Sequence, residues 1–134
     1  MTDGTIDHIG IATSSLDESQ QLWSILGFTH GEDQINSEQG VKIRFMNGNT
    51  STRIELLEPL GDDTPVGKFI SKYGPGIQQI AVRVADIEET ISVLLSVGVK
   101  MVSETPTLGA DGHRIAFIHP SSAGGVLIEL VESD

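Results

Sequence analysis

The chain contains two copies of one sequence pattern, and this repeat restricts its fold more than any other feature. The segment IDHIGIA at positions 6–12 aligns without a gap on IQQIAVR at positions 77–83, an offset of 71 residues (77 − 6). The apolar positions that follow keep this offset until both copies reach a glycine, Gly27 or Gly98. Further on, IELL from position 54 matches IELV from position 128. Because the same segments recur in the same order, we predict a duplicated module, with a period far longer than that of solenoid repeats.

Each copy predicts one helix between strands. Apolar segments suited to a strand lie at 6–12 and 77–84. A helix is expected at about 17–26 and again at about 87–97, because serine or aspartate precedes each segment, acidic residues occupy its first turn and a glycine follows it. The remaining predicted strands are 28–32, 41–46 and 51–57 in the first copy and 100–103, 114–118 and 125–131 in the second.

These elements predict the α+β fold class, with two tandem βαβββ modules in a single domain that covers residues 1–134. The first module spans about 5–60 and the second about 76–132. Between them, a proline at a tolerated first-turn position favours a short linking helix over about 64–73.

Some side chains have simpler expected roles. The first helix is expected to bury an apolar stripe, with Trp23 in the core beside Leu16, Leu22 and Leu26. Three histidines adjoin glycine, aspartate or proline and are expected in turns or on the surface. They are His30, His113 and His119.

Charge and composition exclude several classes of function. The chain has 19 acidic and 8 basic residues, a net charge of −11, which argues against a nucleic-acid partner or an anionic membrane surface. No apolar run is long enough to span a membrane, and the acidic N-terminal segment does not resemble a signal peptide. The absence of cysteine excludes disulfides, thiolate metal sites and cysteine nucleophiles. The cytoplasm is the expected compartment.

Four polar residues are predicted to share one face of apolar strands. Because side chains alternate across a strand, His8, Glu55, Gln79 and Glu129 all point away from their apolar neighbours. The repeat pairs His8 with Gln79 and Glu55 with Glu129. A carboxylate in an apolar strand is unfavourable unless it is paired or metal-bound, so the set predicts a site for one divalent cation with nitrogen and oxygen ligands. The simpler interpretation is a solvated sheet face.

Five motifs carry a resemblance to a known enzyme family. The segments IDHIGIA, EQGV, TRIELLEPL, GPGIQQIAVRVADIE and HPSSAGGVLIEL occur in this order. Together they resemble methylmalonyl-CoA epimerases of the vicinal oxygen chelate superfamily, which also includes glyoxalases, bleomycin resistance proteins and dioxygenases. The resemblance covers about residues 5–132. It implies paired βαβββ modules that form a curved mixed sheet cupping a metal site, a homodimer, and an acyl-CoA thioester as the substrate.

The resemblance also implies the ligands of the metal. Epimerases of this type carry them at the positions of His8, Glu55, Gln79 and Glu129. The family usually has histidine where Gln79 stands, and some members carry a second catalytic carboxylate at the position of Ile43. The lysine common after the His-Pro dipeptide is Ser121 here. An amide oxygen is a harder and weaker donor than imidazole, so Co²⁺, Mn²⁺, Ni²⁺, Zn²⁺ and Mg²⁺ all remain open.

The activity implied by the resemblance is the interconversion of (R)- and (S)-methylmalonyl-CoA. It requires removal of the α-proton, stabilisation of the enolate oxygen and return of a proton to the opposite face. Glu129 and Glu55 are the expected catalytic residues, one for each face. A glyoxalase I (lactoylglutathione lyase) is the alternative enzyme, and a non-enzymatic module that binds a small molecule is the alternative without catalysis.

Overall fold

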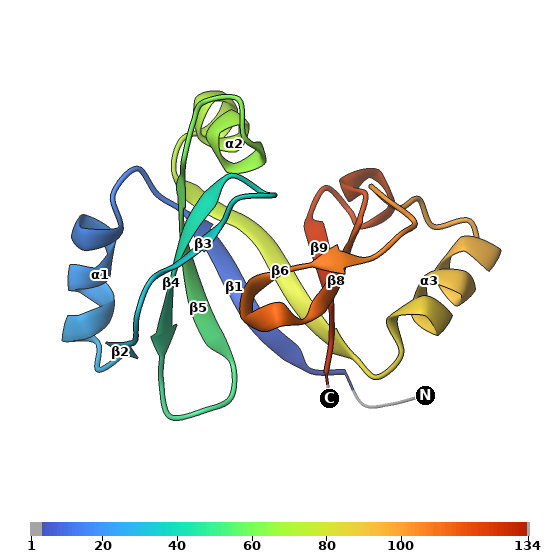
Figure 1. Cartoon of the computed structure of the whole chain (residues 1–134), viewed down its shortest axis with the longest axis horizontal. Coiled ribbons are helices and arrows are strands. Elements are labelled where there is room, and N and C mark those ends of the chain that lie inside the picture. Colours follow the sequence, from blue (N-terminus) through green and yellow to red (C-terminus); the bar gives the residue numbers. More distant parts are fainter. Residues whose placement is uncertain (1–3, 134) are drawn as a thin grey trace. The chain divides into compact units, whose positions relative to one another are not determined.

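The structure is a computed structural model that describes residues 4–133 in two compact units (Figure 1). The first unit comprises residues 8–78. The second unit comprises residues 79–133 together with residues 4–7.

The first unit has a strand, a helix and a series of further strands. Its elements are β1 (Ile6–Ala12), α1 (Leu16–Ile25), β2 (Thr29–His30), β3 (Gln34–Asn36), β4 (Val41–Asn47), β5 (Arg53–Pro59) and α2 (Pro65–Tyr73). The first two residues of β1 belong to the second unit. β1 pairs with β5 in parallel, whereas β4 is antiparallel to β5, β2 and β3. Helix α2 is the predicted linking helix. It begins after Thr64, whose side chain caps the nitrogen of Gly67, and has proline in its first turn.

The second unit repeats this plan. Its elements are β6 (Gly76–Val84), α3 (Ile87–Ser96), β7 (Thr107–Leu108), β8 (Arg114–Ile118) and β9 (Leu127–Glu132), with short 3-10 turns at Ala110–Gly112 and Pro120–Ser122. The first three residues of β6 belong to the first unit. β6 pairs with β9 in parallel, and β8 is antiparallel to β9 and β7. The two units therefore share one strand pairing pattern, which confirms the α+β class and the two βαβββ modules.

The strand registers show that the repeat extends to single residues. In the first unit Gly10, two residues after His8, is the partner of Glu55. In the second unit Ala81, two residues after Gln79, is the partner of Glu129. His8 thus corresponds to Gln79, and Glu55 corresponds to Glu129, as the alignment of the two copies predicts.

In each unit the helix covers one face of the strands with an apolar core. Beneath α1, Leu16, Met46 and Leu56 are buried, with Ile11 and Ile54 packed against them. Beneath α3 the equivalent core consists of Ile87, Ile91, Met101, Ala116 and Leu130. Because alternate residues of a strand point to opposite faces, these contacts direct the polar residues of the same strands to the face without a helix.

The expected apolar stripe of α1 is wrong in part. Leu16 is buried and Trp23 packs in the core, but the side chains of Leu22 and Leu26 are each 59% exposed. The helix instead turns Ser19 and Gln20 inward, where each has a polar partner: the Ser19 hydroxyl donates to Thr13 Oγ1, and Gln20 accepts from Arg44. The inward side of this helix therefore combines the apolar Leu16 and Trp23 with two polar side chains that have partners.

Several strand boundaries also differ from the sequence predictions. Of the strand expected at 100–103, only a bridge from Met101 to Ile118 is present. The strand expected at 28–32 shortens to Thr29–His30, while β3 and β7 were not predicted. Among residues 4–133, no helix combines the length and the apolar character that crossing a bilayer requires.

Candidate active site

The first unit buries a histidine and a carboxylate on the face without a helix. His8 of β1 and Glu55 of β5 are each only 3% exposed, and His8 Nε2 lies 3.1 Å from Glu55 Oε2. Glu55 pairs in register with Gly10, which has no side chain, so His8 and Glu55 are diagonal neighbours on adjacent strands. The pair is a nitrogen and oxygen donor set held by two rigid strands.

An aromatic ring supports this pair. Phe45 of β4 is the register partner of Glu55, and its ring meets the imidazole of His8 in a T-shaped arrangement with centroids 6.0 Å apart. The guanidinium of Arg53 lies 3.8 Å from the centroid of the same ring. Contact with Phe45 therefore restricts the orientation of the imidazole, because edge-to-face packing favours a defined ring angle.

The second unit buries an amide and a carboxylate at the corresponding positions. Gln79 Nε2 donates a hydrogen bond to Glu129 Oε1 at 2.7 Å, and each residue is 6% exposed. Phe117 is the register partner of Glu129, as Phe45 is of Glu55. Around this pair the face is apolar, with Ala81, Ile115, Val131 and Phe117 packed together. The predicted set of four residues therefore lies as two buried pairs, one in each unit.

The donor atoms of these pairs fit a hard or borderline divalent cation. Imidazole nitrogen, carboxylate oxygen and amide oxygen are ligands that such ions accept, and burial of Glu55 and Glu129 is unfavourable without a compensating partner. Among residues 4–133 the structure shows no group of three or more His, Asp or Glu side chains that could hold a metal ion. Neither pair is thus a complete metal site by itself.

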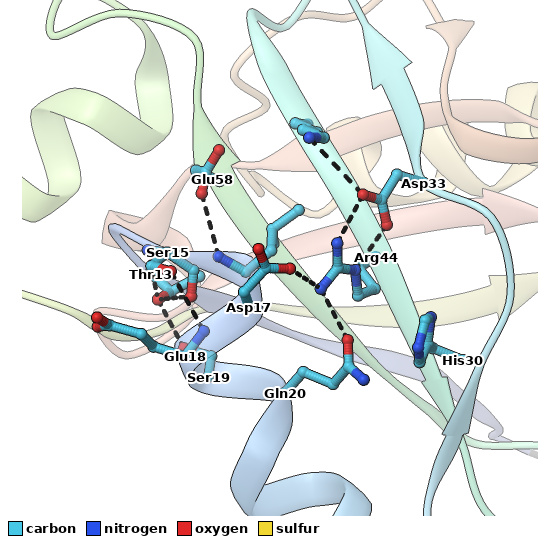
Figure 2. Close-up of polar contacts among 12 residues, drawn as sticks. Thr13, Ser15, Asp17, Glu18, Ser19, Gln20, His30, Asp33, Arg44 and Glu58 are labelled. Atoms are coloured by element: carbon cyan, nitrogen blue, oxygen red, sulfur yellow. Dashed lines mark hydrogen bonds and ion pairs between the residues drawn. The ribbon is translucent and has the colours of Figure 1, made fainter.

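A second carboxylate on each of the two strands has a separate role that sequence reasoning missed. Glu58, three residues after Glu55, accepts a hydrogen bond from the backbone nitrogen of Leu16 at 3.0 Å (Figure 2). Glu132, three residues after Glu129, accepts one from the nitrogen of Ile87 at the same distance. Odd spacing along a strand sends the two carboxylates to opposite faces. The second one therefore meets the first turn of the helix, where a free N–H group needs an acceptor.

Figure 2 shows the polar contacts that fix α1 against β4. Arg44 is 9% exposed and forms a fork on Asp33, with distances of 2.7 Å from Nε to Oδ1 and 2.8 Å from Nη2 to Oδ2. Its Nη1 also donates to Asp17 and Gln20 of α1. The hydrogen bonds from Arg44 hold the pKa of Asp33 below its ordinary value and, in return, raise the pKa of Arg44.

The remaining residues singled out in the sequence lie outside these pairs. Ile43 is 3% exposed, so the position of the extra family carboxylate is an apolar wall. His119 caps the 3-10 turn at Pro120–Ser122, where its Nδ1 accepts a hydrogen bond from the nitrogen of Ser121 at 3.0 Å. His30 ends β2 and is exposed, while His113 directly precedes β8.

Comparison with known proteins gives consistent matches over most of the chain. Residues 7–117 match the profile of the Glyoxalase/Bleomycin resistance protein/Dioxygenase superfamily. The mitochondrial methylmalonyl-CoA epimerase of Dictyostelium discoideum is 39% identical over 131 residues, which cover 96% of this chain and 78% of that protein. The crystal structure of methylmalonyl-CoA epimerase from Mycobacterium tuberculosis matches with a TM-score of 0.91 and 41% identity, covering 96% of this chain and 87% of that one.

A further structure is informative because it contains a ligand. A variant of Streptomyces coelicolor methylmalonyl-CoA epimerase, in complex with 2-nitronate-propionyl-CoA, matches with a TM-score of 0.90 and 37% identity. The match covers 96% of this chain and 94% of that chain.

Proposed function

Since this chain belongs to the Glyoxalase/Bleomycin resistance protein/Dioxygenase superfamily, we propose that it is an enzyme that interconverts (R)- and (S)-methylmalonyl-CoA. The observation that carries this proposal is the symmetry of the buried carboxylates. Glu55 and Glu129 hold the same register position in the two modules, each beside a nitrogen-bearing side chain. Two carboxylates at equivalent positions suit a reaction in which one group removes a proton from one face of a carbon and another returns a proton to the opposite face.

The ligands proposed for one divalent metal are His8 through a ring nitrogen, Glu55 and Glu129 through carboxylate oxygens, and Gln79 through its amide oxygen. When bound, such an ion supplies Lewis-acid stabilisation to an oxygen that gains negative charge. The amide nitrogen of Gln79 donates to Glu129; in this orientation the amide oxygen is the atom that can act as a ligand, because an amide N–H group is only a donor.

The proton carriers proposed are Glu129 and Glu55. Glu129 removes or returns the α-proton on one face of the substrate carbon, and Glu55 does so on the other. The hydrogen bond from Gln79 fixes one oxygen of Glu129, which orients the carboxylate. The apolar side chains around Glu129 exclude water from it, and this limits competing proton exchange. Ile43 offers no carboxylate, so we assign both roles to residues of β5 and β9, with Glu38 or a bound water as the alternative carrier of the second proton.

Two other functions are less well supported. Glyoxalase I moves a proton next to a thioester, but several relatives and structures that match most of this chain are methylmalonyl-CoA epimerases. A non-enzymatic binding module has no need for two buried carboxylates at symmetric positions.

An isotope experiment tests the proposed reaction. Purified protein with Co²⁺ or Mn²⁺ is added to a single epimer of methylmalonyl-CoA in D₂O, and the products are followed by chiral separation and mass spectrometry. The expected result is formation of the other epimer with deuterium at the α-carbon. Turnover of methylglyoxal and glutathione, without epimer interconversion, would assign the chain to the glyoxalase reaction instead.

We propose that residues 1–134 function as one domain, that the protein forms a homodimer, and that it works in the cytoplasm. Light scattering of the purified protein after size-exclusion chromatography measures the oligomeric state. A mass of one chain, 14.3 kDa, at working concentration would contradict the dimer.

A further inference from the structure

Helix α2 has a positively charged face in an otherwise acidic chain. Lys68 and Lys72 lie four residues apart, so they share one face of the helix, and both side chains are exposed. No Asp or Glu occurs between Pro65 and Tyr73. In a chain with 19 acidic residues, this segment is a local exception.

The two lysines also differ from most other cations because no carboxylate of residues 4–133 is ion-paired with them. By contrast, ion pairs with Asp or Glu are formed by Lys42, Arg44, Arg83 and Arg114. The charge of Lys68 and Lys72 is thus not neutralised by the protein, which is the condition for binding an anion at the surface.

An aromatic ring adjoins the lysines. Tyr73, at the end of α2, is 66% exposed, and its ring centroid lies 5.2 Å from Lys72 Nζ and 5.2 Å from the ring of Phe69. An exposed ring of this kind offers a stacking surface for a nucleotide base, while the adjacent cations suit its phosphates. Together the three residues fit a phosphorylated nucleotide better than a simple anion.

The position of α2 relative to β5 agrees with this assignment. α2 follows β5 in the chain and packs against it, and Pro59, the last residue of β5, is roughly 13 Å along the strand from Glu55. A hollow of about 330 Å³ lies between them, but its lining includes Glu58 and Asp62, whose charge disfavours a phosphate. The lysine face of α2 is the better location for an anion.

We propose that Lys68, Lys72 and Tyr73 bind the 3′-phosphoadenosine diphosphate end of coenzyme A. This inference rests on the proposed function, in which the substrate is an acyl-CoA. The pantetheine arm separates the thioester from the phosphates. The nucleotide therefore has to be held at a distance from Glu55. Helix α2, which packs against β5, provides cations that can hold it.

Binding and kinetics together test the proposal. Affinity for free CoA and for 3′-dephospho-CoA is measured by titration calorimetry for the wild type, K72Q, K68Q/K72Q and Y73A. K100Q is the matched control, because Lys100 is an exposed lysine of the second unit and its removal changes the net charge as K72Q does. We expect CoA binding to weaken ~3–5-fold for K72Q and ~10-fold for K68Q/K72Q, with no change for K100Q. Circular dichroism and thermal unfolding check that each variant is folded.

The kinetic readout separates nucleotide binding from chemistry. With methylmalonyl-CoA, K68Q/K72Q should raise KM and leave kcat near the wild-type value, whereas with methylmalonyl-pantetheine, which lacks the nucleotide, variant and wild type should agree. Equal CoA affinity in K68Q/K72Q and wild type, or an equal effect of K100Q, would overturn the proposal. If the wild type fails to epimerise but binds CoA through these lysines, the proposed reaction is wrong and this site stands.

Discussion

At the residue scale, the spacing of glutamates along β5 and β9 separates two roles. Glu55 and Glu129 lie on the face without a helix, buried beside His8 or Gln79. Glu58 and Glu132, three residues later, bind the first turn of a helix. Each strand thereby carries one buried carboxylate that we propose as a proton carrier and another that ties the helix to the strand, and this arrangement occurs in both modules.

Replacement of either inner glutamate by glutamine is expected to impair catalysis more than metal binding. Glutamine keeps an oxygen ligand but cannot carry the proton, so E129Q and E55Q should each lower the epimerisation rate by ~10²–10⁴-fold. Metal content by inductively coupled plasma mass spectrometry and rate by chiral separation measure the two effects. An E55Q variant with its metal and nearly full rate would assign the second proton to another group.

Removal of His8 is expected to abolish both metal binding and activity. The imidazole is the one nitrogen ligand of the proposed set, and in H8A the buried Glu55 also loses its partner at 3.1 Å. H113A is the control, since His113 lies outside both buried pairs, and it should keep metal and activity. A fully metal-loaded H8A protein would refute the proposed ligand set.

At the element scale, hydrogen bonds from Arg44 add to the apolar packing that holds α1 against the strands. Arg44 of β4 binds Asp17 and Gln20 of the helix and Asp33 of the segment before β3 (Figure 2). The guanidinium is suited to this because it donates several hydrogen bonds in fixed directions. The hydrogen bonds that join α1 to β4 and to Asp33 therefore all depend on the guanidinium of Arg44.

We expect R44K to lower the free energy of unfolding by ~2 kcal/mol, because lysine retains the charge but cannot form the fork on Asp33 and also reach Asp17. The matched control is K42Q. Lys42 contacts the same Asp33 at 3.7 Å but is 39% exposed, so its loss should cost less than ~0.5 kcal/mol. Urea unfolding followed by circular dichroism measures both. Equal effects would show that charge, and not hydrogen-bond geometry, stabilises the network.

The ion pair between Arg44 and Asp33 predicts a loss of stability at low pH. Arg44 lowers the pKa of Asp33 from its ordinary value of 3.8. The ionised carboxylate therefore stabilises the fold above that value, and this contribution is lost as the pH falls through the lowered pKa. In D33N the contribution is absent at every pH, so the variant should lose less stability than the wild type between about pH 5 and about pH 2. Parallel pH profiles for the two proteins would contradict this role of Asp33.

At the scale of the whole molecule, charge is the dominant surface property. The net charge of −11 means that many carboxylates have no cation to neutralise them, and repulsion among them destabilises the compact state. The few cations therefore matter both for stability and for binding anions. The paired ones hold elements together, whereas Lys68 and Lys72 remain available on α2.

Added salt is expected to stabilise the protein. Raising NaCl from about 0.05 M to about 1 M shortens the screening length. Screening should then weaken the repulsion among the excess carboxylates more than it weakens the attraction within the few ion pairs. Tm by differential scanning fluorimetry should rise, and KCl should act like NaCl if screening is the cause. A fall in Tm would mean that ion pairs such as those of Arg44 and Arg114 dominate stability.

The sequence by itself determined the repeated part of this protein. Matching segments in the same order gave the two modules, and strand alternation placed His8, Glu55, Gln79 and Glu129 on the face away from the apolar residues, as the registers show. The strands at 6–12 and 114–118 have their predicted bounds. These features follow from local periodicity and from comparison of the two copies, which need no knowledge of distant contacts.

Only the tertiary structure shows which polar residues are hydrogen-bond partners. Nothing local shows that Glu58 binds Leu16 42 residues away, or that Arg44 draws Gln20 inward and leaves Leu22 exposed. The short strands β3 and β7 likewise depend on β4 and β8 as partners. A charged side chain gains from burial only when its partners are in place, and those partners come from segments that are distant in the sequence.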